Sequence, residues 1–196
     1  GSGGLWNEAV DHFARLRHLM AQPPRYRYEL GEVIRLCQWT IANDPKLGEP
    51  YRGSCYFLQT SRMLQLFPGD FKKVAENCAK VPGTLQRTCF ESMGRDVGGV
   101  HRGNYEAEFK ACSYAPKGTM RVGCLIGAVQ DSFWDSSGQD EAIGFCKALT
   151  DKEEKTSCYD ILFVRAPDIL AKNDLGAFCK KAEAEYQSLC TQRIAR

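Results

Sequence analysis

The chain has 196 residues and a formal net charge of +2, with 43% hydrophobic and 26% charged residues. These proportions are ordinary for a folded domain. Lysine and arginine are spread along the whole length, which predicts no nucleic-acid or anionic-membrane partner. No apolar run approaches the roughly 18 residues that a membrane span needs.

Three helices are predicted before residue 69. Residues 1–4 (Gly-Ser-Gly-Gly) resemble an expression-vector remnant, so a signal peptide or membrane anchor could have been removed with the natural start. Apolar residues at helical spacing predict helices over residues 5–21, 26–42 and about 49–66. Prolines end these helices because proline lacks the amide donor and clashes with the preceding turn, at Pro23-Pro24, Asn43-Asp44-Pro45 and Phe67-Pro68-Gly69.

A two-helix unit then recurs four times. Its first helix opens at Gly69-Asp70, Gly103-Asn104, Gly138-Gln139 and Asn173-Asp174. Asp70, Asn104 and Asp174 are the expected N-caps, since their side-chain oxygens can accept from first-turn amides. A short turn leads to the second helix, at Pro82-Gly83, Pro116-Lys117-Gly118, Thr150-Asp151 and about residues 182–184.

Each unit carries one cysteine in each helix. The ten cysteines of the chain are Cys37, Cys55, Cys78, Cys89, Cys112, Cys124, Cys146, Cys158, Cys179 and Cys190. An even number at regular spacing favours disulfides and an oxidising compartment. No two lie closer than eleven positions, so the clustered ligands of a zinc site and the C-x-x-C motif of redox proteins are both absent.

The spacing of the cysteines predicts how they pair. In the last four units the first cysteines lie 34, 34 and 33 residues apart, and the two within a unit lie 11 or 12 apart. Antiparallel helices packed ~8–10 Å apart bring facing Cα atoms to roughly 4–6 Å, the separation that a disulfide needs. We therefore expect one disulfide in each hairpin: Cys37–Cys55, Cys78–Cys89, Cys112–Cys124, Cys146–Cys158 and Cys179–Cys190.

This period predicts an all-α fold, an α-solenoid of about five antiparallel helical hairpins. We expect a single domain over residues 5–196, with divergent N-terminal helices over 5–68 and four regular disulfide hairpins over 69–196.

The 34-residue, two-helix unit resembles the tetratricopeptide repeat family and its cysteine-bearing relatives, the Sel1-like repeats. That family has small residues twelve positions apart where its helices touch, and Cys112/Cys124 and Cys146/Cys158 have this spacing. Residues 41–45 followed by 49–51 also resemble the end of one repeat and the start of the next. The resemblance concerns architecture, because the family's Trp-Leu-Gly-Tyr pattern is absent from residues 105–115.

A solenoid of this kind is expected to bind partners on a concave face built from the first helix of each hairpin. If Cys112 faces the second helix, Glu106 and Phe109 lie on the groove side. Lys72, Lys147 and Lys180 are taken as the matching positions in the other units. Trp134 is a candidate aromatic anchor, although packing against the next repeat is the favoured interpretation.

No set of residues predicts catalysis, a cofactor or a metal site. The glycine-rich segment 94–99 lacks a preceding strand and a Gly-Lys-Ser/Thr motif, so we expect an inter-repeat linker. With every cysteine paired there is no spare thiolate nucleophile. Ordinary structural roles are expected for the remaining polar groups: surface or loop positions for His12, His18 and His101, polar helix starts for Glu106/Glu108 and Glu153/Glu154, and a helix start for residues 25–28.

The sequence therefore predicts a non-enzymatic protein-interaction or assembly scaffold without cofactors, located in an oxidising compartment: secreted, periplasmic or at the cell surface. One alternative is a small-molecule carrier or enzyme with a pocket between repeats. Another is a helical hairpin protein of the mitochondrial intermembrane-space type, whose helices carry two cysteines each, whereas each helix here carries one.

Overall fold

A computed structural model describes residues 45–195 of the chain. Regular structure in these residues is entirely helical, which confirms the predicted all-α class for this range. No helix within 45–195 is long and apolar enough to cross a membrane. The elements are α3 (Pro45–Leu66), α4 (Phe71–Cys78), α5 (Leu85–His101), α6 (Tyr105–Cys112), α7 (Thr119–Ser132), the short 3-10 helix η1 (Ser136–Gly138), α8 (Gln139–Ala148), α9 (Lys152–Ile169), α10 (Leu175–Lys181) and α11 (Ala184–Ile194).

Disulfides join four consecutive pairs of helices. Their Cα separations of 5.4 to 5.6 Å lie within the range that the bond requires. Cys55 on α3 is also disulfide-bonded, whereas its predicted partner Cys37 lies outside the described residues, so that pairing stays a prediction. The confirmed pairings are Cys78–Cys89, Cys112–Cys124, Cys146–Cys158 and Cys179–Cys190.

Side-chain caps fix where several helices begin. Asp70 and Asn104 each accept from a first-turn amide, at 3.0 and 3.1 Å, as predicted. Asp174 makes no capping bond, so that prediction is wrong. Its backbone is already helical (φ −92°, ψ −16°) and lacks the extended geometry that turns an N-cap side chain toward the amides. Asp151 caps α9, accepting from two amides at 3.0 and 3.2 Å.

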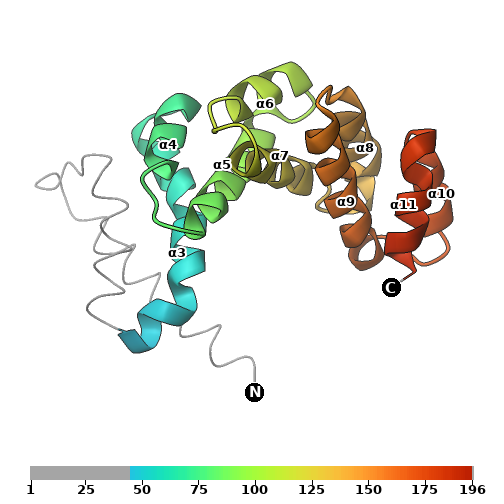
Figure 1. The fold of residues 1–196 in the computed structure, drawn as a ribbon, viewed down its shortest axis with the longest axis horizontal. Coiled ribbons are helices and arrows are strands. Elements are labelled where there is room, and N and C mark those ends of the chain that lie inside the picture. The colour runs from blue at the N-terminus through green and yellow to red at the C-terminus, as the bar shows by residue number, and fades with distance from the viewer. Residues whose placement is uncertain (1–44, 196) are drawn as a thin grey trace, which may run out of the picture.

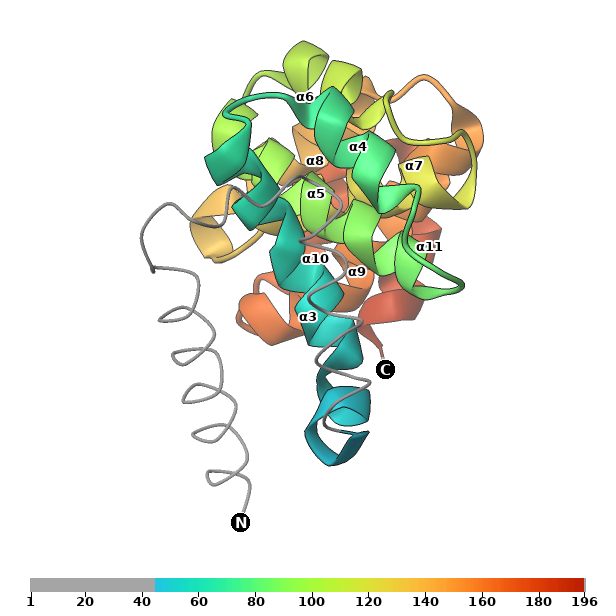
Figure 2. The same ribbon diagram turned by 90° about the vertical axis from the view of Figure 1, so that its left-hand side faces the viewer.

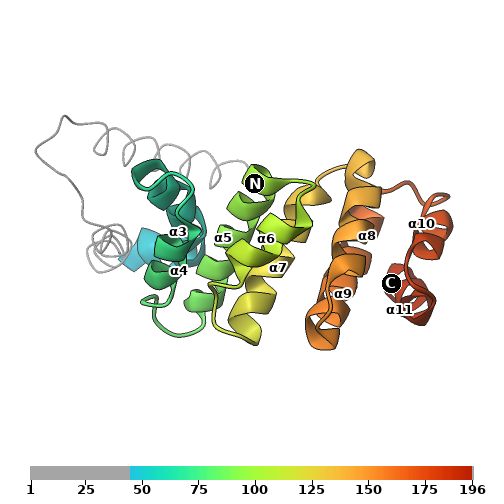
Figure 3. The same ribbon diagram turned by 90° about the horizontal axis from the view of Figure 1, so that it is seen from above.

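The helices form two rows that follow chain order. The longer helices α3, α5, α7, α9 and α11 each contact the next, and α4, α6, α8 and α10 pack onto them (Figure 3). The molecule forms an arch with α4 and α6 on the outer side and α5 and α7 toward the inner side (Figure 1). From the side, α4 and α6 lie above α3 (Figure 2). The first helices therefore do not line the concave side here, contrary to the sequence-based expectation.

Glycines let α5 and α7 approach closely on the inner side of the arch. Gly94 and Gly98 of α5, like Gly123 and Gly127 of α7, lie four residues apart and share a helix face. A Cβ at Gly94 would overlap the carbonyl oxygen of Cys124, so only glycine permits this approach. The arch bends toward the row whose helices approach most closely.

The prediction of an inter-repeat linker over residues 94–99 is therefore wrong, because this segment lies inside α5. Tertiary packing offsets the intrinsic cost of about 1 kcal/mol that each glycine imposes on a helix. The chain that joins α5 to α6 is confined to residues 102–104.

Aromatic contacts fix how successive helix pairs sit on one another. Offset-stacked and edge-to-face rings contribute beyond the apolar area that they bury, so these contacts orient one pair on the next. The ring pairs, with their centroid separations, are Phe109–Phe145 (5.0 Å), Phe133–Phe178 (5.5 Å) and Tyr159–Tyr186 (4.5 Å).

Candidate functional site

The row of longer helices carries an open groove, here called the inner groove. Its volume is about 520 Å³, within the range of roughly 300–1,000 Å³ that is usual for ligand pockets. Contributions come from α3, α5, α7 and α9, so the groove crosses four helices. The lining residues are Phe57, Leu58, Ser61, Arg95, Asp96, Gly99, Gln130, Asp131, Trp134 and Arg165.

The lining residues of α5, α7 and α9 occupy equivalent positions in these helices. Arg95, Asp96 and Gly99 come six, seven and ten residues after Cys89. Gln130, Asp131 and Trp134 have the same spacing after Cys124, and Arg165 comes seven residues after Cys158. Because the disulfides set the helices in register, equivalent positions form one continuous strip across the row.

Trp134 projects into solvent at the edge of the inner groove. Its side chain is 77% exposed, so the favoured expectation that it packs against the next repeat is wrong. The neighbouring Phe133 is fully buried and stacks on Phe178 of α10. Only one of two consecutive residues can point into the contact between helix pairs, and Phe133 takes that place. Leu58 adds a second exposed apolar side chain to the groove, at 46%.

Two arginines line the groove and differ in their contacts. The Arg95 guanidinium lies 3.4 Å from the ring centroid of Phe57 and donates to the Phe57 carbonyl at 3.0 Å. Burial lowers its pKa. Arg165 is half-buried and makes no hydrogen bond or ion pair with any residue between 53 and 195. The Nε of each arginine is buried without an acceptor.

The two acids of the groove are both engaged. Asp96 accepts from the hydroxyls of Thr60 at 2.6 Å and Ser61 at 2.8 Å, which ties α5 to α3. Asp131 forms an ion pair with Arg102 at 2.7 Å. Among the charged side chains of the groove, the Nε donors of Arg95 and Arg165 remain without an acceptor in the described range.

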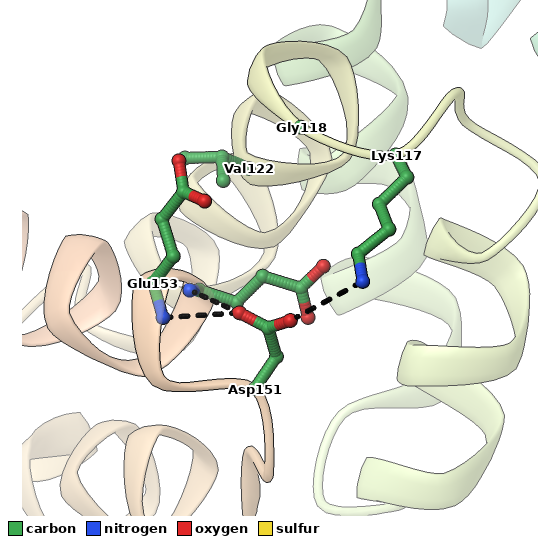
Figure 4. A pocket seen from close by; sticks show the side chains of 6 residues that line it. Lys117, Gly118, Val122, Asp151 and Glu153 are labelled. Atoms are coloured by element: carbon green, nitrogen blue, oxygen red, sulfur yellow. Dashed lines mark hydrogen bonds and ion pairs between the residues drawn. The ribbon is translucent and has the colours of Figure 1, made fainter.

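A second, smaller pocket of about 370 Å³ lies between the starts of α7 and α9 (Figure 4). Lys117 reaches Asp151 across it at 3.6 Å. Asp151 already caps α9, and the backbone hydrogen bond from Glu154 is the main cause of its lowered pKa. The side chains at this pocket therefore have a structural role: Asp151 caps α9 and forms an exposed ion pair with Lys117.

Glu108 is the most perturbed acid in the described range. It is fully buried, and neither of its carboxylate oxygens has a hydrogen-bond partner there. Burial, then the charges of Glu141 and Asp131, raise its pKa to about 7, against the opposing effect of Arg102. The expected polar helix start is wrong for this residue, because position 108 shares a helix face with the buried residues 111 and 112.

All but one of the partner-binding residues predicted from sequence lie away from the inner groove. Four of them are exposed on the shorter helices: Glu106, Lys72, Lys147 and Lys180. Phe109 is half-buried against Phe145. Trp134 is the member of the predicted set that lines the groove. The sequence-based prediction did not include the groove residues Arg95 and Arg165. They could have been found by comparing positions at equal distances after the second cysteine of each unit.

Within residues 45–195, no cluster of three or more acidic, histidine or cysteine side chains could hold a metal ion. His101 is the last residue of α5, with its ring 5.6 Å from that of Phe71, so it is not in a loop. Residues 25–28 and the other two histidines, His12 and His18, lie outside the described range.

Comparison of the chain with protein-family models, curated proteins and solved structures found no match.

Proposed function

We propose that this protein is a non-enzymatic scaffold that binds a protein partner along the inner groove. Trp134 carries the proposal, because a tryptophan 77% exposed beside a groove across four helices has no role in the core. Tryptophan is enriched among the residues that dominate binding energy at interfaces. Its neighbour Phe133 already makes the packing contact with α10, so the exposure of Trp134 needs another explanation.

A second exposed apolar side chain supports the same location. Leu58 also lines the groove and is 46% exposed. Two large apolar side chains exposed at one polar-lined groove favour an interaction surface.

We further propose that the helix pairs are repeats of an α-solenoid similar to tetratricopeptide and Sel1-like arrays. The 34, 34 and 33 residue spacing and the pairing of each short helix with the next longer one support this architecture. In this proposal the disulfides hold each hairpin rigid, so that the groove is formed before a partner arrives. Preorganisation of this kind reduces the entropy lost on binding.

We propose a secreted, periplasmic or cell-surface location. Four disulfides, and the oxidised state of Cys55, support an oxidising environment, because cytosolic glutathione and thioredoxin keep most thiols reduced.

Affinity capture from secreted or periplasmic extracts tests the proposed function. The oxidised protein should retain a protein partner, and Trp134→Ala should lose it. Tyr114→Ala is the matched control, because Tyr114 is 42% exposed but follows the outer helix α6. Retention of the same partner by Trp134→Ala would contradict the proposal. So would a tightly bound small molecule, found by mass spectrometry, with no protein partner.

A further inference from the structure

The free hydrogen-bonding capacity of the inner groove indicates what kind of partner it accepts. Resting on the proposed function, we propose that the groove binds an extended acidic peptide segment. A carboxylate of the segment is held by Arg165 with Arg95 beside it, and an apolar side chain lies against Trp134. Three features of the groove carry this proposal: its arginines, its apolar edge and its span.

The cations come first because neither arginine makes an ion pair with a residue between 53 and 195. Arg165 has no acceptor among residues 53–195, and Arg95 contacts only a ring, a carbonyl oxygen and a hydroxyl there. A guanidinium presents five donors in a planar fork that fits a carboxylate. Asp96 and Asp131 offset part of the charge of Arg95, so Arg165 is the principal cation left for a carboxylate of the segment.

The apolar edge distinguishes a peptide from a small anion. A free anion would need only the arginines, whereas Trp134 and Leu58 expose large apolar surfaces to the same groove. A segment in which acidic and apolar residues alternate supplies both chemistries at once. Charged contacts and an aromatic anchor together are typical of interface hot spots.

The span of the groove fits an extended chain. Four helices packed ~8–10 Å apart extend over roughly 25–30 Å from the first axis to the last. An extended peptide advances about 3.3 Å per residue, so about nine residues cross the row.

The direct test uses fluorescence anisotropy with a labelled nine-residue peptide that alternates glutamate and leucine. A second peptide replaces every glutamate by glutamine. The oxidised wild-type protein should bind the glutamate peptide about tenfold more tightly, since charge-assisted hydrogen bonds are roughly twice as strong as neutral ones. The preference should weaken as salt rises, because the arginines are partly exposed.

Binding of both peptides to the wild-type protein and to an Arg165 variant tests whether Arg165 causes the preference for glutamate. Arg165→Gln should weaken glutamate-peptide binding about tenfold and leave glutamine-peptide binding nearly unchanged. Lys72→Gln removes one charge from the outer helix α4 and is the control, with no change expected. If Arg165→Gln melts early, the comparison of the two peptides on the wild-type protein alone still decides the matter.

Equal binding of the two peptides, or equal losses in Arg165→Gln and Lys72→Gln, would overturn the acidic-peptide proposal. A dimer that blocks the peptide and disappears in Arg165→Gln would also overturn it, in favour of a second copy of the chain. Capture that depends on Trp134 would survive either result, so the scaffold function and the peptide chemistry can fail separately.

Discussion

The backbone carbonyl oxygen of Glu91 lies so close to Gly127 that a Cβ on Gly127 would overlap it. The neighbour is backbone within a helix and cannot rotate away, so Gly127→Ala must push α5 and α7 apart. We expect a loss of about 1–3 kcal/mol in the free energy of unfolding, the usual range for overpacking. Denaturant unfolding followed by circular dichroism measures it.

The matched control lies in the facing helix. Gly99 lies inside α5, as Gly127 lies inside α7, but a Cβ on Gly99 would meet nothing within 4 Å. Gly99→Ala should therefore leave stability unchanged or raise it by about 0.5–1 kcal/mol through helix propensity. Equal stabilities for Gly127→Ala and the wild-type protein would refute the close-packing account.

Phe133 and Trp134 should show opposite effects on stability and binding. Phe133→Ala removes a buried ring that stacks on Phe178 at 5.5 Å, so we expect a loss of about 3–5 kcal/mol. Trp134→Ala removes a side chain that is 77% exposed, and stability should change by less than about 0.5 kcal/mol. Thermal and denaturant unfolding of both variants test the pair. A large loss of stability in Trp134→Ala would show that Trp134 packs in the core.

The sequence was informative about local structure because each signal acts over short distances. Pro82-Gly83 and Pro116-Lys117-Gly118 are turns in any context, and the spacing of Cys112 and Cys124 suits only facing positions on two adjacent helices. These features require no knowledge of how one hairpin sits on the next.

The location of the groove depends on contacts between hairpins. The sequence indicates these contacts less clearly than it indicates turns and helices. Glycine at positions 94 and 98 is a usual sign of a linker, and only the matching pair at 123 and 127 in the next unit indicates a helix contact. That contact lies on the inner side of the arch, where the second helices line the groove. The sequence predicts for Trp134 the packing role that Phe133 takes, because two adjacent aromatic residues do not show which one turns inward.

The disulfides should supply a large share of the stability. Cys112 and Cys124 close a loop of 12 residues, and such a crosslink contributes about 3 kcal/mol by limiting the unfolded chain. Replacing both by alanine should lower the melting temperature by about 6–12 °C, since each kcal/mol shifts it by about 2–4 °C in a chain of 150–250 residues. Strong reductant should lower it further, since it opens the remaining bonds. An unchanged melting temperature in reductant, with free thiols confirmed by alkylation, would show that packing alone holds the fold.

Glu108 should make the protein less stable as pH rises. Its pKa is raised from 4.5 to about 7 in the folded state, so the folded protein holds this proton more tightly than the unfolded chain. The stabilisation is fully present below about pH 4.5 and is lost as pH rises through about 7. The groups that face this carboxyl are Glu141 and Asp131, which favour the proton, and Arg102, which opposes it.

Replacing the carboxyl by a neutral amide isolates this effect. At pH 8 the wild-type protein carries a buried carboxylate without a hydrogen-bond partner in the described range, so Glu108→Gln should be more stable by about 2–3 kcal/mol. At pH 4 the difference should largely vanish, since the wild-type carboxyl is then protonated. Glu106→Gln is the control, because Glu106 is exposed on the same helix and should show no such dependence. A difference between Glu108→Gln and the wild-type protein that stays constant from pH 4 to pH 8 would mean that this carboxyl does not titrate in that range.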